Sequence, residues 1–410
     1  MPTRHQKKTA SRTTTHDVII IGGGLSGGTM ACLLGNAGLR VACIDEGSPA
    51  THASSTFDGR TIAISWGSRK IVDRAGLWDE LEGDACPINR IDILDGNSPV
   101  LLDFHSDEVN DQVFGWIVEN RLLRQAIFNG LKNSRTIDHM APVRVLGMNH
   151  SDDIITVTIE GNRTLSAPLA VGADGRASWV REQAGIGLRS WPYHQNAIVC
   201  TVEHEYPHNN LAVEHFRSEA PFAILPMTDG KNGAYRSSVV WTEHRQHSGA
   251  ILSMPQDVFD IALTARFPKS YGRVRQIGKH FTHPLSLSHA HRYTAPRLAL
   301  IADAAHSIHP IAGQGLNLGF RDIDSLCSLI LASVGGDIGG DMLLAEYERA
   351  RRIDNMAMAA ATDGLNRLFS SRTPFLSDLR RIGIGMVAKT PITKRFFMHQ
   401  AMGARSGSSS

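Results

Sequence analysis

The chain has 410 residues, enough for two domains or for one large domain with an insertion. Its apolar fraction of 42% and charged fraction of 20% are those of a globular protein and exclude global disorder. A formal net charge of +2 gives no general attraction to nucleic acid, so no nucleic-acid partner is expected.

The cysteines and the chain ends bear on the compartment. Five isolated cysteines without a Cys-x-x-Cys pair indicate reduced thiols in a cytoplasmic protein. No apolar run is long enough for a membrane span. Residues 1–15 are basic and Ser/Thr-rich, which favours a disordered tail over the alternative of a transit peptide, and residues 404–410 are expected to be flexible.

The first pattern with a chemical meaning lies between residues 17 and 46. The β-branched run from Val18 to Ile21 predicts a buried parallel strand, and a Gly-x-Gly-x-x-Gly turn follows it at Gly22, Gly24 and Gly27. A helical segment and a second strand that ends at Asp45 complete the unit. Glycines let a pyrophosphate approach the helix N-terminus, and the acid can accept a hydrogen bond from a ribose hydroxyl. This unit predicts dinucleotide binding but does not decide between FAD and NAD.

A second strand–turn–helix pattern covers residues 169–186. An apolar strand leads into Asp174 and Gly175, and the helix after them carries Ser178 and Arg181 at helical spacing. Alone, an Asp-Gly pair at a strand end indicates a turn with a helix cap as readily as a ligand contact.

The stretch ADAAHSIHPIAGQGLNLGFRD, residues 302–322, is a second glycine-rich turn. Asp303 ends a predicted strand, where an acid can bind a polyol such as a ribityl chain, and a helix is expected to begin near Gly315. The small residues around Pro310 leave room for a flat ring beside the backbone. His306 and His309 do not form a convincing metal site with Asp303, so local hydrogen bonding is favoured and no metal is expected.

The rest of the chain divides into a strand-rich and a helical region. Residues 186–289 alternate apolar and polar side chains, which predicts a mostly antiparallel sheet with Phe216, Phe222 and Trp241 in its core. The last eighty residues are predicted to be helical. Between residues 367 and 405, eight basic residues stand against one acid among apolar residues that include Met398. This segment is either a solvated helix packed on the body, the favoured reading, or a basic amphipathic surface for anionic lipid.

These residues together resemble the FAD-dependent aromatic hydroxylases of the para-hydroxybenzoate hydroxylase superfamily, and especially their ubiquinone-biosynthesis branch. HPIAGQGLNLGFRD is nearly the signature of that branch, and the segments 57–81, 115–127 and 347–369 follow its pattern. The resemblance extends from Asp17 to Gly403. One departure is Ala302, which replaces the usual glycine and adds a methyl group near the ribityl chain.

The resemblance implies an α/β fold with a Rossmann-like FAD-binding domain, a mostly antiparallel substrate domain and C-terminal helices. It assigns residues 16–78, 111–185 and 290–325 to the FAD-binding domain. Residues 79–110 and 186–289 would form the substrate domain, and residues 326–403 a C-terminal helical region.

The same resemblance implies cofactor contacts. The ADP half of FAD would be held by Gly22, Gly24, Gly27 and Asp45, with further contacts from Arg60 and from Arg121, which is favoured over Arg124. Asp174 and Gly175 would contact FAD and NAD(P)H, and Asp303 the ribityl chain. The backbone along the isoalloxazine would be Pro310, Gly313, Gly315, Leu316 and Asn317. The sequence singles out no acid or base, so Pro310 is the residue predicted nearest to the chemistry.

The reaction implied by the resemblance is hydroxylation of an aromatic ring. NAD(P)H or another donor would reduce FAD, O₂ would add to give a flavin C4a-hydroperoxide, and the substrate would be a polyprenylated phenol of ubiquinone biosynthesis. Expected partners are this phenol, other ubiquinone-biosynthesis proteins and, peripherally, the inner face of a bacterial membrane. The alternatives are the same chemistry on a small soluble aromatic compound, and a catalytically silent FAD-binding scaffold. A simple NAD-dependent dehydrogenase is disfavoured, because it has no use for Asp303 and a second glycine turn.

Overall fold

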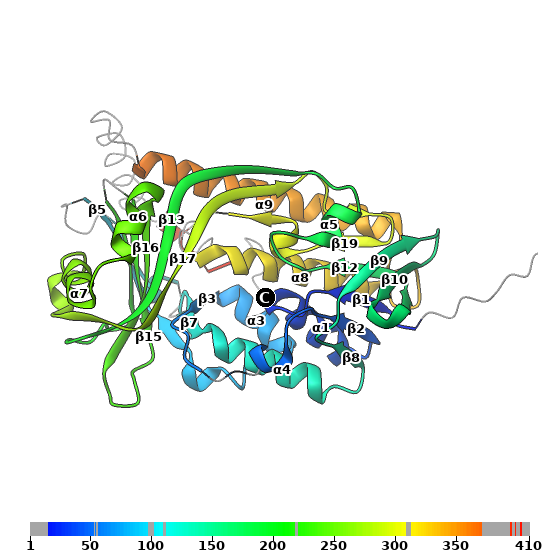
Figure 1. The fold of residues 1–410 in the computed structure, drawn as a ribbon, viewed down its shortest axis with the longest axis horizontal. Coiled ribbons are helices and arrows are strands. Elements are labelled where there is room, and N and C mark those ends of the chain that lie inside the picture. The colour runs from blue at the N-terminus through cyan, green and yellow to red at the C-terminus, as the bar shows by residue number, and fades with distance from the viewer. Residues whose placement is uncertain are drawn as a thin grey trace, which may run out of the picture.

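A computed structural model of the chain describes residues 15–52, 54, 56–96, 102–109, 112–217, 220–308, 313–370, 394–395, 398 and 402–403. The glycine-rich N-terminal unit lies in the middle of a six-stranded sheet, here called the parallel sheet, in the order β18-β19-β12-β1-β2-β8 (Figure 1). Its strands are β1 (Val18–Ile21), β2 (Val41–Ile44), β8 (Ile137–Met140), β12 (Leu169–Gly172), β18 (Thr294–Ala295) and β19 (Leu298–Leu300). All pairings are parallel except that of β18 with β19.

Every residue of β1 and β2 is buried, which explains why both strands are continuous apolar runs without alternation. Helix α1 (Leu25–Asn36) follows β1 and packs against α4 (Asn120–Asn133) and α8 (Gln314–Ala332). Helix α9 (Asp341–Ser370) packs on α8 in turn. The N-terminal strand–turn–helix–strand unit is therefore confirmed.

The second large element is an eight-stranded sheet, here called the large sheet, in the order β20-β17-β13-β16-β15-β14-β5-β6. Its strands are β5 (Arg90–Asp95), β6 (Leu102–His105), β13 (Leu188–His204), β14 (Leu211–Phe216), β15 (Pro221–Met227), β16 (Tyr235–His244), β17 (Val274–Ala290) and β20 (His306–Ser307). It is antiparallel except where β14 pairs with β5. The long strands β13 and β17 run from this sheet across to the parallel sheet (Figure 1). The predicted α/β class with a mostly antiparallel second sheet is confirmed.

Smaller elements complete the fold. Two three-stranded sheets consist of β3 (Thr61–Ser65), β7 (Gly115–Glu119) and β4 (Cys86–Ile88), and of β11 (Arg163–Ala167), β10 (Ile155–Ile159) and β9 (Val145–His150). The remaining helices are α2 (Pro49–His52), α3 (Trp66–Arg74), α5 (Trp179–Gln183), α6 (Arg245–Leu252) and α7 (Gln256–Thr264), with 3-10 turns η1 (Glu82–Asp84), η2 (Ser106–Val109), η3 (Glu160–Asn162), η4 (Lys269–Tyr271) and η5 (Ala302–Ala304). The strand alternation of residues 186–289 did not reveal α6 and α7.

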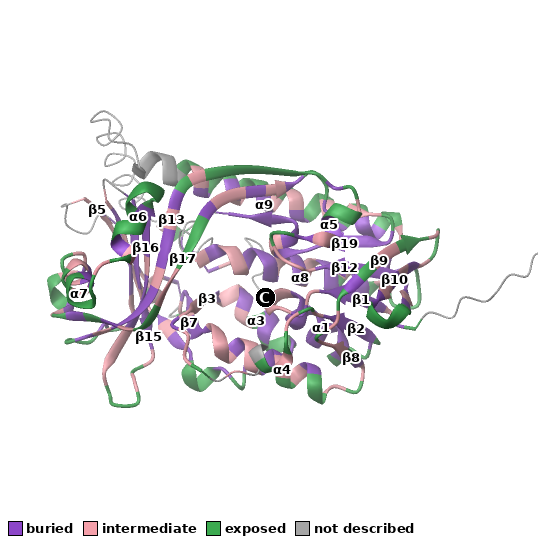
Figure 2. Cartoon of the chain, viewed as in Figure 1, coloured by how far each residue is buried: buried purple, intermediate pink, exposed green. Residues whose placement is uncertain are grey.

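The buried core residues lie along the parallel sheet and the large sheet (Figure 2). Phe216, Phe222 and Trp241 are buried as predicted, and the Trp241 ring stacks on Phe259 of α7 at a centroid distance of 5.8 Å. All five cysteines are buried free thiols. Within the described part of the chain, no helix is both long and apolar enough to cross a bilayer.

Three of the predicted segments lie near the ends of the chain. Residues 1–14, 404–410 and most of 371–401 lie outside the described residues. Met398, one of the apolar residues of the basic C-terminal segment, is fully buried and packs in a cluster with Phe104, Phe114 and Met402. At Met398 and Met402 the segment is packed on the body.

Candidate functional site

The first glycine turn combines close packing with open space. A Cβ atom on Gly22 would lie 2.4 Å from the carbonyl oxygen of Ala173, and one on Gly27 would lie 1.9 Å from the carbonyl oxygen of Gly22. A Cβ atom on Gly24 would meet nothing within 4 Å. Gly24 caps α1 without a side-chain hydrogen bond, so the first amides of this helix remain open to an anion.

Asp45 lies at the tip of β2, beside this turn. Its carboxylate accepts hydrogen bonds from the backbone amides of Gly23 at 2.6 Å and Gly47 at 2.5 Å, which hold it in place. It lines a cavity of about 410 Å³ together with Gly22, Gly24, Asp174 and Gly175. The first two motifs found in the sequence thus meet in one cavity, whose size is that of a small-molecule site.

The Asp174 side chain caps helix α5. It accepts hydrogen bonds from the Ser178 hydroxyl at 2.5 Å and from the Val180 amide at 3.0 Å. The buried Arg181 guanidinium donates to the carbonyl oxygens of Ala304 and Arg176, each at 2.9 Å. The helix-cap interpretation of the Asp-Gly pair is correct for its side chain, and Arg181 joins this motif to the turn that carries Asp303.

Asp303 lies in η5, with its carboxylate about half exposed and 3.2 Å from Nε of Arg176. The preceding Ala302 has φ of +52°, a left-handed conformation that favours glycine. Its methyl group lies against Gly319 of α8, where a Cβ atom would be only 2.8 Å away. The departure from glycine is thus accommodated by a second glycine.

A buried acid fixes both ends of this turn. One oxygen of Asp322, Oδ2, accepts hydrogen bonds from the Ala302 amide at 2.9 Å and from Nε2 of His306 at 2.6 Å. The other oxygen accepts from Nε of Arg351 at 2.8 Å and from the Asn355 amide group at 3.2 Å. Burial alone would raise the pKa of Asp322, but His306 and Arg351 outweigh it and hold this pKa below its ordinary value. The predicted local hydrogen bonding of His306 is confirmed.

The start of α8 is anchored through Asn317. Its side chain accepts a hydrogen bond from the Ser65 amide at 2.9 Å and donates to the carbonyl oxygens of Ala63 and Gly313 at 3.0 Å each. Gly313 caps the helix with φ of +63°, and a Cβ atom on Gly315 would meet nothing within 4 Å. The amides of Gly315 and Leu316 belong to the first turn, which has no intrahelical acceptors. His309 and Pro310 lie outside the described residues.

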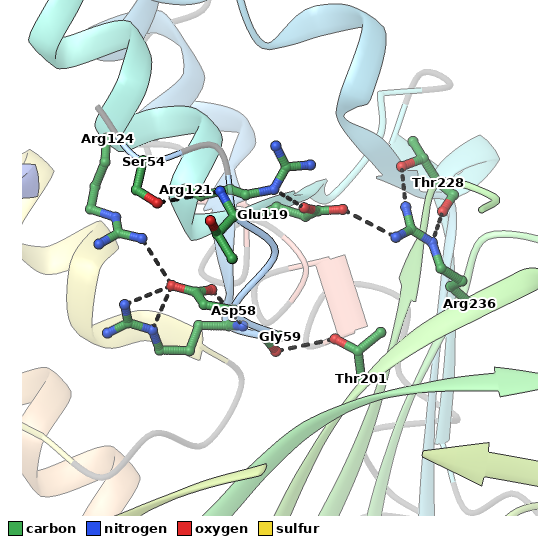
Figure 3. Close-up of polar contacts among 11 residues, drawn as sticks. Ser54, Asp58, Gly59, Glu119, Arg121, Arg124, Thr201, Thr228 and Arg236 are labelled. Atoms are coloured by element: carbon green, nitrogen blue, oxygen red, sulfur yellow. Dashed lines mark hydrogen bonds and ion pairs between the residues drawn. The ribbon is translucent and has the colours of Figure 1, made fainter. Parts of the chain in front are cut away.

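The predicted arginines lie in two separate clusters (Figure 3). Arg60 and Arg124 share one oxygen of Asp58, at 2.7 and 2.8 Å. Arg121 instead donates to Glu119 at 2.7 Å. Asp58 was not predicted from the sequence, although it stands two residues before Arg60 in the segment 57–81.

A loop joins the Asp58 cluster to the large sheet (Figure 3). The Thr201 hydroxyl of β13 donates to the carbonyl oxygen of Gly59 at 3.1 Å, and the Thr61 hydroxyl donates to Ser238 of β16 at 2.6 Å. The loop that carries Asp58 and Arg60 is therefore attached to β13 and β16 of the large sheet.

Comparison with known proteins agrees with this geometry. A family model described as an FAD binding domain matches residues 15–362. Ubiquinone hydroxylase UbiL of Rhodospirillum rubrum is 45% identical over 397 residues, which cover 96% of this chain and 91% of that protein. The 3-demethoxyubiquinol 3-hydroxylase of Escherichia coli is 30% identical, over 94% of this chain and 98% of that one. The chain belongs to the ubiquinone-biosynthesis hydroxylases, within the FAD-dependent monooxygenases.

The fold of this hydroxylase is shared with more distant monooxygenases. The crystal structure of p-nitrophenol 4-monooxygenase PnpA from Pseudomonas putida DLL-E4 aligns with a TM-score of 0.75 at 19% identity, over 96% of this chain and 99% of that one. The resemblance found in the sequence is confirmed, and FAD is the cofactor of the enzyme.

The residues present fit FAD. An open cradle at Gly24, a fixed acid at Asp45 and a second acid at Asp303 lie around the meeting point of the three sequence motifs. The cavity beside Gly24 has space for the nucleotide end. The first turn of α8 offers the amides of Gly315 and Leu316 for the flavin end, whereas the sequence prediction was the amides of Leu316 and Asn317.

Proposed function

We propose that this enzyme hydroxylates the aromatic ring of a polyprenylated phenol in ubiquinone biosynthesis. The observation that carries the proposal is the 45% identity to a ubiquinone hydroxylase, which extends over nearly the whole of both chains. NAD(P)H or another donor would supply electrons, and O₂ the oxygen atom. Bound FAD supplies the oxygen-activating chemistry, which the protein orients and shields from water.

The residues have separate tasks in this proposal. The N-terminal amides of α1, exposed by Gly24, hold the diphosphate, and Asp45 accepts a hydrogen bond from the adenosine ribose. The Asp303 carboxylate accepts hydrogen bonds from the ribityl hydroxyls. The amides of Gly315 and Leu316 lie at the positive end of α8 and stabilise negative charge on the flavin ring. Pro310 stays predicted as the backbone neighbour of the ring.

The substrate, by this proposal, lies between the flavin and the large sheet. Contact with other ubiquinone-biosynthesis proteins and with the cytoplasmic face of a membrane belongs to the same proposal, because the substrate carries a lipid tail. The alternative of a small soluble aromatic substrate is represented by the p-nitrophenol 4-monooxygenase, but at 19% identity that similarity shows the fold alone.

Complementation tests the proposal. The gene is expressed in a set of strains, each of which lacks one of its own ubiquinone-ring hydroxylases, and quinone intermediates are identified by mass. Restored ubiquinone together with loss of one accumulated intermediate is expected, and a Gly24→Ala variant should fail to restore it. A protein that binds FAD but restores no hydroxylation step at any ring position would refute the proposal and support a silent scaffold. NAD(P)H oxidation stimulated only by a small soluble phenol would support the other alternative.

A further inference from the structure

Two contacts fix the register between helices α1 and α4. A Cβ atom on Gly28 would lie 2.3 Å from Cγ2 of Ile127, and one on Gly130 would lie 2.8 Å from Sγ of Cys32. From the first contact to the second, the residue number increases by about one helical turn on both helices, from 28 to 32 on α1 and from 127 to 130 on α4. The two helices therefore run parallel. One turn earlier, Gly24 at the start of α1 therefore lies level with residues 123 and 124 of α4.

Helical geometry separates the two arginines of α4. At about 100° per residue, Arg124 projects within about 60° of Ile127, the residue that contacts α1, whereas Arg121 projects about 120° away from it. Arg124 is thus on the side of α4 that faces the first glycine turn.

The hydrogen bonds of Arg124 leave it incompletely satisfied. Its Nη2 donates to Asp58 at 2.8 Å, but its Nε is buried and has no hydrogen-bond partner among the described residues. Burial lowers the pKa of Arg124, which the nearby carboxylate of Asp58 only partly offsets. Such a guanidinium can still donate hydrogen bonds to an anion.

Other positive groups gather at the same place. Arg60 shares the Asp58 carboxylate, and its guanidinium lies 5.4 Å from the ring centre of Phe281. Burial lowers the pKa of His283, and the charges of Arg176 and Arg60 lower it further, so these groups lie close enough to act on one another. The Asp58 carboxylate faces Arg60 and Arg124 from the loop, and the Asp303 carboxylate lies beside Arg176.

Arg121 forms its ion pair elsewhere. It donates to Glu119, a buried carboxylate whose other oxygen lies 3.2 Å from Arg236 of β16 (Figure 3). Arg236 also donates to the carbonyl oxygen of Thr228. This chain of contacts ties α4 to the large sheet.

We propose that Arg124, in place of Arg121, is the α4 arginine that binds the diphosphate of FAD, and that Asp58 holds Arg124 and Arg60 beside the phosphate site until the cofactor arrives. The inference rests on the FAD site at Gly24 and is independent of the substrate. Arginine suits this task because its planar group donates to two phosphate oxygens at once.

Matched methionine variants test it. FAD is titrated into cofactor-free protein at fixed ionic strength, and the dissociation constant is measured from the quenching of flavin fluorescence. Arg124→Met should weaken FAD binding about 10- to 100-fold, the effect of one charge-assisted contact. Arg121→Met should change it less than about threefold, since Glu119 keeps Arg236. Arg124→Lys, which retains the charge and the fold, should lie between wild type and Arg124→Met.

The Asp58→Asn variant distinguishes two roles of Arg124: direct binding of the diphosphate, and an ion pair with Asp58 that only holds the loop in place. If Arg124 acts on the diphosphate, Asp58→Asn should weaken FAD binding less than Arg124→Met does, because the arginine that contacts the phosphate remains. Equal weakening by Asp58→Asn and Arg124→Met would overturn the proposal, because it would show that their mutual ion pair is what matters. Weakening by Arg121→Met as large as that by Arg124→Met would overturn it as well. Hydroxylation assays play no part in this test, so its failure is distinct from failure of the proposed substrate.

Discussion

The contact between Ala302 and Gly319 allows a quantitative test of how the Asp303 turn is built. A Cβ atom on Gly319 would lie 2.8 Å from Cβ of Ala302, 3.3 Å from Oγ of Ser26 and 3.5 Å from Cα of Ala302. The serine can rotate away, whereas η5 and helix α8 are both backbone elements held by Asp322. Gly319→Ala is therefore expected to overpack this interface.

The expected magnitude follows from two opposing effects. Overpacking costs about 1–3 kcal/mol, and replacing a glycine inside a helix by alanine returns about 1 kcal/mol. Gly319→Ala should thus lower the free energy of unfolding by about 1 kcal/mol. In an Ala302→Gly background the clashing methyl is gone, so the same change should raise the free energy by about 1 kcal/mol.

Ala302→Gly alone should be close to neutral. Relief of the left-handed conformation stabilises by about 1–2 kcal/mol, while the lost methyl burial and the freer unfolded chain each cost about 0.5–1 kcal/mol. The coupling between the two positions is then about 2 kcal/mol.

Urea denaturation of the cofactor-free protein measures all four species of this cycle. The four unfolding transitions must have equal slopes for the comparison to hold. A coupling below about 0.5 kcal/mol, the usual limit of additivity, would refute the claim that the two residues are matched in size.

Other expected outcomes concern the glycine turn, the buried acid and the thiols. Gly24→Ala should leave the stability of the cofactor-free protein nearly unchanged but weaken FAD binding at least about tenfold. Gly27→Ala, whose Cβ would lie 1.9 Å from a carbonyl oxygen, should lower both the stability and the FAD affinity. Asp322→Ala should lower the free energy of unfolding by about 3–5 kcal/mol, because it leaves Arg351 with less compensation in a buried site. Because the pKa of Asp322 is depressed in the folded state, its stabilisation is present above the ordinary value of about 4 and is lost as the pH falls below it; Asp322→Asn should flatten this loss in urea titrations at pH 3–5. Burial raises the pKa of Cys86 to about 12, so the native protein should not react with a thiol reagent at pH 8 until urea is added, and rapid labelling would contradict its burial.

The sequence was most informative where chemistry depends on local spacing. The run from Val18 to Asp45 specifies strand, turn, helix and strand through contacts within some thirty residues, and its predicted elements match β1, α1 and β2 closely. Alternation in residues 186–289 likewise predicted the strands β13 to β17 of the large sheet, because side chains on a half-buried strand alternate. Helices α6 and α7 escaped notice, since short amphipathic segments between strands carry a weak periodic signal.

Partner choice among charged side chains required the tertiary structure. Arg121 and Arg124 are three residues apart with the same chemistry, and only the packing of α4 on α1 shows which of them faces Gly24. The same holds for Asp322, twenty residues from the Ala302 amide that it binds. Local spacing thus predicted a dinucleotide site, and the resemblance of the whole sequence to a family supplied the cofactor FAD. The register between distant elements decided which side chains surround the site, because ion pairs depend on distances in space that no local pattern encodes.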